Sequence, residues 1–154
     1  MVATHQLGFE AFNLRDPADV RRLLERRPDL EARVEELRSR LRAQGVEPAQ
    51  TLPPSCTSAV SLHRSWPLGN PYTRHRVSCS RAWIEGEIAA EILNHDTGEQ
   101  RRNHRVLWYA SSGVVDSGTI PYRAGNYYCG YADGILWFDQ WVMYPAGSPA
   151  CGTL

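Results

Sequence analysis

The period of the hydrophobic pattern changes near residue 50 of this chain. Before that point apolar side chains recur at the spacing of an α-helix, whereas after residue 55 they alternate with polar ones, as in half-buried β-strands. All 5 Trp, all 7 Tyr and all 4 Cys also lie after residue 55. The sequence therefore predicts helices near the N-terminus, followed by a β-rich domain.

The segment 13–45 carries the start and stop signals of helices. Asp16 can cap a first helix that has Pro17 in its first position. Pro28 interrupts that helix and is expected in the first turn of a second one, for which Gly45 is a suitable C-cap. We predict a short arm at 1–12 and a helical arm or hairpin at 13–45.

One apolar stripe runs along the second expected helix, with steps of four, three and four residues that are typical of a two-heptad coiled-coil seam. Its members are Leu30, Val34, Leu37 and Leu41. A helix pair this narrow buries little surface by itself, so the stripe must pack on another surface. The chain's own β-domain, a second copy and a different protein all remain open as that surface.

The β-rich part is expected at 56–154, after a linker at 46–55 in which three prolines favour an extended chain. Short alternating runs separated by Gly- and Asn-containing turns predict an antiparallel β-sandwich. The fold class is thus mainly β with N-terminal helices. The expected strands are 59–63, 74–93, 100–110, 114–120, 127–131 and 135–144, with turns at 94–99, 111–113 and 132–134.

Tyr127 and Cys129 would share one face of a strand, because strand side chains alternate. This spacing resembles the end of the sixth strand of immunoglobulin-like domains, where a tyrosine precedes a buried disulfide cysteine. The resemblance implies an immunoglobulin-like shape and a sheet-to-sheet bridge between Cys79 and Cys129. A second bridge, Cys56–Cys151, would then staple the ends of the β-region. The residues alone allow three connectivities.

The segment 135–144 is apolar on both faces of a single straight strand, where Trp137 and Trp141 would share one face with Ile135 and Met143. One face must line the core, and the other must meet the helices, a partner protein or a sugar. We therefore name Trp137 and Trp141, together with the helical stripe, as candidate binding residues. Carbohydrate remains possible as a ligand.

Charge and cysteine content narrow the class of partner and the compartment. The chain has 17 basic and 17 acidic residues, so no excess of charge points to nucleic acid. No apolar run reaches the ~18–20 residues of a membrane span. An even number of cysteines indicates an oxidising, secreted or extracellular setting. No secretory signal is visible at residue 1, so a presequence that was removed and replaced by a start Met, another export route and a cytosolic protein with free thiols all remain open.

Motifs that carry chemistry are scarce in this sequence. It has no P-loop, no G-x-S-x-G and no H-E-x-x-H, and without C-x-x-C spacing we expect neither structural zinc nor a cofactor. A polar set could converge across a hairpin as a metal or acid–base site, or form an ordinary solvated tip. Its members are Asn94, His95, Asp96 and His104.

The function expected from these patterns is that of an extracellular, non-enzymatic binding or assembly module. It would dock or self-associate through its helices and present an aromatic β-domain to a protein partner. One alternative is a structural subunit of a phage or of a secreted toxin particle. Another is a small secreted hydrolase that uses His95 or His104.

Overall fold

A computed structural model describes residues 1–44 and 52–154, which form one 7-stranded sheet and two α-helices. The protein is therefore mainly β, as predicted. Residues 46–51 of the expected linker lie outside the described residues. In chain order the elements are β1 (Ala3–Asn13), α1 (Pro17–Arg26), the short 3₁₀-helix η1 (Pro28–Leu30), α2 (Glu31–Ala43), β2 (Cys56–Arg64), β3 (Pro71–Asn94), β4 (Gln100–Asp116), β5 (Tyr127–Trp137), β6 (Trp141–Ala146) and β7 (Ala150–Thr153).

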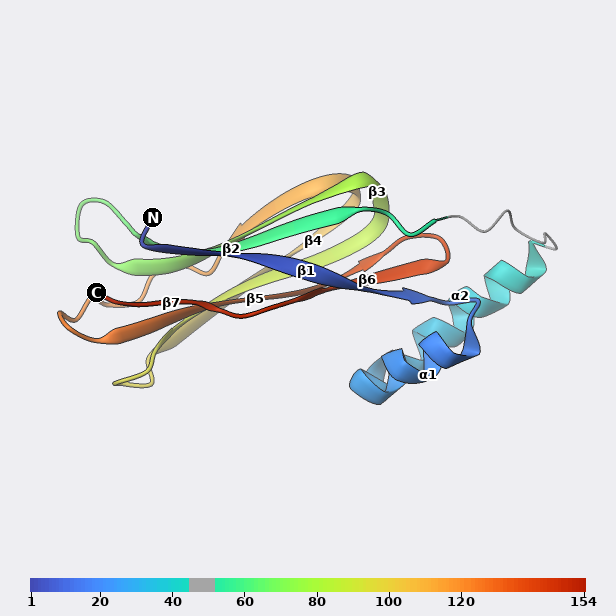
Figure 1. Ribbon diagram of the computed structural model, residues 1–154, viewed down its shortest axis with the longest axis horizontal. Helices are drawn as coiled ribbons and strands as arrows, with labels where there is room; N and C mark the ends of the chain where they lie inside the picture. Colours follow the sequence, from blue (N-terminus) through green and yellow to red (C-terminus); the bar gives the residue numbers. More distant parts are fainter. Residues whose placement is uncertain (45–51) are drawn as a thin grey trace.

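The sheet closes on itself (Figure 1). Strands β3, β2, β1, β6 and β5 are neighbours in that order, and β5 pairs again with β3. The result is a barrel, to which β4 and β7 are added as extra strands, rather than the two facing sheets of the predicted sandwich. Residues 3–12, which the sequence assigned to an arm, supply β1 to this ring together with Asn13, so the helices follow the first strand.

β3 closes the ring because it takes part in it twice. Its first half, residues 71–79, pairs with β2, and its second half, residues 85–94, pairs with β5. Between the two halves its register with β4 shifts, from Ser78 to Trp83. Irregularities of this kind bend a strand and increase its local twist. The bend is what lets one long strand serve two sides of the barrel.

β4 follows β3 around this bend, so that its own two halves come together at their free edge. The Asn103 side-chain amide donates to the backbone carbonyl of Asp116 at 3.2 Å. The Arg105 guanidinium donates to the carbonyl of Val114 at 2.7 Å. The strands predicted at 100–110 and 114–120 are therefore largely one continuous strand that ends at Asp116.

Two glycines that suggested turns lie inside strands instead. A Cβ at Gly113 would come within 2.5 Å of the Leu107 side chain, where the two halves of β4 approach. A Cβ at Gly134 would come within 2.6 Å of the Glu87 carbonyl oxygen on β3. Glycine in a strand often marks such a close approach. The turns predicted at 111–113 and 132–134 were wrong for this reason, whereas the turn at 94–99 joins β3 to β4 as expected.

The single strand predicted at 135–144 is a hairpin. The backbone N–H of Phe138 donates to the carbonyl of Trp141 at 2.8 Å and closes the turn between β5 and β6. Asp139 and Gln140 form the turn, and the Asp139 carboxylate accepts the Gln140 N–H at 2.7 Å. These two residues are the strongly polar ones of the segment, and residues of this kind are typical of turns.

The hairpin changes which residues share a face. Leu136 lies opposite Met143, and Trp137 lies opposite Val142. Directly paired residues point to the same side of a sheet. Trp137 therefore faces the helices, whereas Trp141 packs against the interior cluster that contains Leu136 and Met143. The prediction that the two tryptophans share one face was wrong.

The helices begin where the sequence placed them. The Asp16 carboxylate accepts the N–H of Ala18 at 2.9 Å, and Pro17 is the first residue of α1. Pro28 begins η1, which leads directly into α2 at Glu31. These starts depend on local backbone preferences, which proline and a capping carboxylate satisfy.

Both helices lie at one end of the barrel (Figure 1), where they cover one apolar cluster. Of the three surfaces left open for the helical stripe, the chain's own sheet contacts it: Val34 and Leu41 are buried there, and Leu30 and Leu37 are partly buried. Neither helix of the described part is long and apolar enough to cross a membrane. The buried cluster contains Phe12, Leu14, Val20, Leu23, Val34, Leu41, Ile135, Trp137, Val142 and Tyr144.

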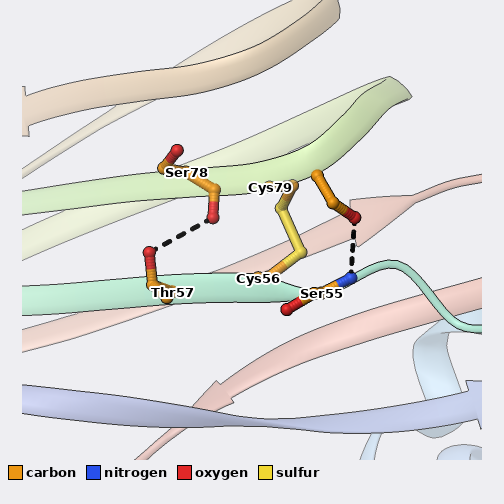
Figure 2. Close-up of a disulfide and its surroundings, with 6 residues drawn as sticks. Ser55, Cys56, Thr57, Ser78 and Cys79 are labelled. Atoms are coloured by element: carbon orange, nitrogen blue, oxygen red, sulfur yellow. Dashed lines mark hydrogen bonds between the residues drawn. A yellow bond between two sulfur atoms is a disulfide. The ribbon is translucent and has the colours of Figure 1, made fainter.

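All four cysteines form disulfides, as predicted, but with a different pairing: Cys56–Cys79 and Cys129–Cys151. Each bond joins residues directly opposite on neighbouring strands, β2 with β3 and β5 with β7. Figure 2 shows the first bond, beside which the Ser55 N–H donates to the Ser80 hydroxyl at 2.9 Å. The immunoglobulin-like bridge Cys79–Cys129 is thus replaced by cross-strand bonds within one closed sheet.

Candidate functional site

A groove of about 530 Å³ lies between α2, the bend of the β3–β4 hairpin and the β5–β6 turn. Three elements distant in the sequence meet there because the helices pack on the outer face of β5 and β6. Its volume lies in the range of about 300–1,000 Å³ that is usual for ligand sites. The lining residues are Ala32, Arg33, Glu36, Leu37, Arg40, Ile84, Glu85, Trp108, Tyr109, Trp137 and Phe138.

Arg33 packs against the residues that form the floor of the groove. Its guanidinium lies 4.4 Å from the centroid of the Trp137 ring, as in a cation–π contact. The same guanidinium donates to the Glu85 carboxylate on β3. Trp137 itself is buried, so Arg33 connects α2 to both the barrel wall and the tryptophan beneath it.

The rim of the groove carries exposed aromatic side chains from β4. Trp108 is 59% exposed and Tyr109 is 76% exposed, beside the partly exposed Ile84 of β3. Tyr109 has a φ of 51°, in the left-handed region that bulky residues seldom adopt. Backbone strain of this kind costs ~1–3 kcal/mol and concentrates at binding sites. The β4 bend thus presents two large aromatic surfaces to solvent.

The charged residues of the groove are already paired. Arg33 contacts Glu85, and Arg40 on α2 contacts Glu36 one turn earlier. Burial lowers the pKa of the Arg33 guanidinium, and the nearby Glu36 carboxylate raises it in part. It remains a cation near neutral pH, because the ordinary pKa of arginine is so high. The groove therefore offers apolar surface and a balanced set of charges.

We compared the chain with protein-family models, curated proteins and solved structures. None of them matches it.

The structure brings together two of the residues named from the sequence. Leu37 and Trp137 both line the groove. Val34 and Leu41 are buried beneath α2, and Leu30 is partly buried against the same cluster.

Trp108 and Tyr109 are the most exposed aromatic residues of the groove, and neither was predicted as a binding residue. The available signal was the run Val106-Leu-Trp-Tyr-Ala, which is apolar on both faces of a strand that is otherwise polar. A strand of this kind needs cover for both faces or leaves one as an interaction surface. Here Trp108 and Tyr109 both stay exposed beside α2.

A buried serine–histidine pair is a second group of side chains that could take part in chemistry. The Ser58 hydroxyl lies 2.6 Å from Nε2 of His75, and Nδ1 of His75 lies 3.1 Å from the Ala89 carbonyl. A carbonyl only accepts, so Nδ1 carries the proton and Nε2 accepts from the serine. Burial lowers the pKa of His75 to about 4. Both side chains are buried, so the pair holds the barrel interior together instead of facing a substrate.

The polar hairpin set is spread over the β3–β4 turn. Nε2 of His95 lies 3.2 Å from the Tyr131 hydroxyl, and the Asp96 carboxylate accepts the N–H of Tyr127 at 2.7 Å. His104 is exposed on β4. Within residues 1–44 and 52–154 there is no group of three or more His, Cys, Asp or Glu side chains placed to hold a metal ion.

Proposed function

We propose that this protein is a non-enzymatic binding module that takes an apolar segment of a protein partner in the groove beside α2. The single observation behind the proposal is the pair of exposed aromatics, Trp108 and Tyr109, at the rim of a groove of about 530 Å³. Trp and Tyr are enriched among the residues that dominate the energy of protein interfaces. Exposed apolar surface of this kind marks sites of interaction in soluble domains.

The charges of the groove support an uncharged occupant. Because Arg33 and Arg40 already have carboxylate partners, an apolar segment leaves no new unpaired charge when it enters. A strongly charged segment would have to compete with these intramolecular pairs. The rim aromatics supply large contact area with few rotatable bonds, which lowers the entropy cost of binding.

We place this binding activity outside the cytosol. All four cysteines are in disulfides. Such bonds persist in oxidising compartments and are rare where thioredoxin and glutathione keep thiols reduced. The two bonds support a module that remains folded in an extracellular setting.

The proposal is tested by screening the whole protein against a displayed library of random peptides and, in parallel, against a glycan array. We expect apolar peptides to bind the native protein and to lose at least tenfold in affinity with Trp108→Ala or Tyr109→Ala. The matched control is Tyr127→Ala, since Tyr127 is an exposed aromatic residue of β5 that does not line the groove. That control should bind the same peptides unchanged.

Two results would contradict this proposal. Peptides that bind equally well to the groove variants would show that another surface carries the activity. Binding of glycans that is lost with Trp108→Ala, without peptide binding, would identify a sugar platform instead.

A further inference from the structure

The end of the molecule opposite the helices carries a projecting apolar loop. Residues 65–70 join β2 to β3 at the far end of the long axis (Figure 1). Trp66 is 93% exposed and Leu68 is 74% exposed. Single exposed apolar residues are ordinary, but a nearly uncovered tryptophan next to an exposed leucine is a concentrated apolar tip.

The loop that presents this tip is fixed by its own hydrogen bonds. Across its base the Ser65 N–H donates to the Asn70 carbonyl at 2.8 Å, and the Gly69 N–H donates to the Ser65 carbonyl at 2.7 Å. The Arg64 guanidinium donates to the Gly69 carbonyl at 3.0 Å. It also lies 3.9 Å from the centroid of the Tyr122 ring. A tip held in this way loses little freedom when it enters a pocket.

We propose that the occupant of the groove is the 65–70 loop of a second copy of this chain, so that copies associate head to tail. The inference rests on the proposed function, because it uses the groove beside α2 as the receiving surface. The loop lies at the opposite end of the long axis from α2 and the β5–β6 turn, which line the groove, so one molecule offers both surfaces at once (Figure 1). A contact between two different surfaces is heterologous and produces chains or rings rather than a closed symmetric dimer.

Neither surface brings an unpaired charge to the contact. Residues 65–70 contain no ionisable side chain. The groove's arginines, Arg33 and Arg40, are each paired with a glutamate. Entry of the loop therefore buries Trp66 and Leu68 against Trp108 and its neighbours without stranding a charge in the interface.

The strength of this association follows from its size. One short loop in one groove is a small contact, and interfaces below about 1,200 Å² are usually transient. We therefore expect association that depends strongly on concentration. A high local concentration would favour longer arrays, because each added molecule forms one further contact of the same kind.

The experiment is sedimentation velocity on the full chain over a wide concentration range, with Trp66→Ala as the loop variant and Trp108→Ala as the groove variant. We expect the native protein to form species beyond a dimer at high concentration. Each variant alone should remain at the 17.4 kDa of one chain. An equimolar mixture of the two should form a dimer and stop there, because the intact groove of one variant accepts the intact loop of the other.

Each other outcome would overturn the inference. A native protein that stays monomeric while its groove still binds displayed peptides would refute head-to-tail association and leave the proposed function standing. A mixture that forms no dimer, or a variant that still self-associates, would show that different surfaces meet. Binding of phosphatidylcholine vesicles by the native protein but not by Trp66→Ala would instead identify the tip as a lipid anchor. Near-ultraviolet circular dichroism verifies that both variants are folded.

Discussion

The barrel interior and the cluster under the helices are both apolar, but they are held by different interactions. The interior is enclosed by a ring of backbone ladders and contains the hydrogen-bonded pair Ser58 and His75, and two disulfides join neighbouring strands of the sheet. The helix cluster lies outside that ring, where α1 and α2 cover β5 and β6 mainly through side chains. Segments held by few backbone ladders open at lower free energy than the strands of a closed sheet.

The β5–β6 hairpin belongs to both regions. Leu136 and Met143 face the barrel interior, whereas Ile135 and Trp137 face the helices. This double role explains why the segment is apolar on both faces. It also allows the two regions to be compared by substitutions on adjacent residues, since neighbouring side chains point to opposite sides.

The largest effect is expected from a matched pair of leucines. Leu136 in the interior and Leu23 under the helices are both fully buried. Truncation of a buried leucine to alanine costs ~2–5 kcal/mol. We expect Leu136→Ala to lower the stability of the whole molecule, and Leu23→Ala to release the helices while the barrel stays folded.

Urea unfolding followed by the helical circular-dichroism signal and by tryptophan fluorescence measures the difference. For Leu136→Ala the two transitions should move together to lower urea. For Leu23→Ala the helical transition should precede the other. Coincident transitions in both variants would show one cooperative core and remove the distinction between the regions.

A somewhat smaller effect is expected from acid, and it acts on the barrel. His75 is neutral in the folded interior with a pKa lowered to about 4, against an ordinary value of 6.5. The unfolded chain therefore binds more protons between pH 6.5 and pH 4, and stability falls as the pH falls through that window. The loss from His75 amounts to at most about 3 kcal/mol and levels off below pH 4.

Urea titrations at several pH values measure this loss, with His75→Gln as the control. Burial also lowers the pKa of His63, so the control separates the two histidines. An unchanged pH dependence in His75→Gln would contradict the assignment.

The helix region should lose stability at alkaline pH instead. Burial raises the pKa of Tyr144, so the stability that depends on its neutral form is lost when its hydroxyl deprotonates in alkali.

The smallest effect is expected at the projecting loop. Trp66→Ala should change the free energy of unfolding by no more than ~0.5 kcal/mol, because the side chain touches little of its own molecule. Thermal unfolding by calorimetry at low protein concentration is the measurement. A loss of several kcal/mol would mean that Trp66 packs within its own chain and that the tip is not free to enter a groove.

The helices could be predicted because their signals are local. Asp16 and Pro17 fix the start of α1, and Pro28 fixes the break before α2, whatever the rest of the chain does. The stripe of Val34 and Leu41 was also readable as a buried face. The surface against which this stripe packs could not be predicted, because the residues that cover a helix lie elsewhere in the sequence.

The barrel and its disulfides could not be predicted because they depend on distant pairings. β1 pairs with β2 along its first half and with β6 along its second, so its apolar residues do not alternate simply. Cys129 lies opposite Cys151 only because β7 returns beside β5. A local resemblance to a tyrosine-and-cysteine strand carries no information about that return.

The candidate site was predictable only in part. Leu37 and Trp137 belong to apolar stripes and were named as binding residues, but the groove exists only where α2 meets the β3–β4 bend. The open face of Trp108 follows from that bend, which a register shift produces. Strand alternation predicts two faces, but only the packed chain determines which of them stays uncovered.

The two side chains that bridge the halves of β4 bear on how this protein avoids aggregation. An uncovered strand edge is a template on which another chain can add, which leads to fibrils and swapped domains. Asn103 and Arg105 occupy carbonyls that such an intruding strand would use. Both residues lie on the exposed surface, but shorter side chains at these positions would leave unpaired carbonyl groups along the edge of β4. Two carbonyls of this edge are thus already hydrogen-bonded within the chain and are not open to an added strand.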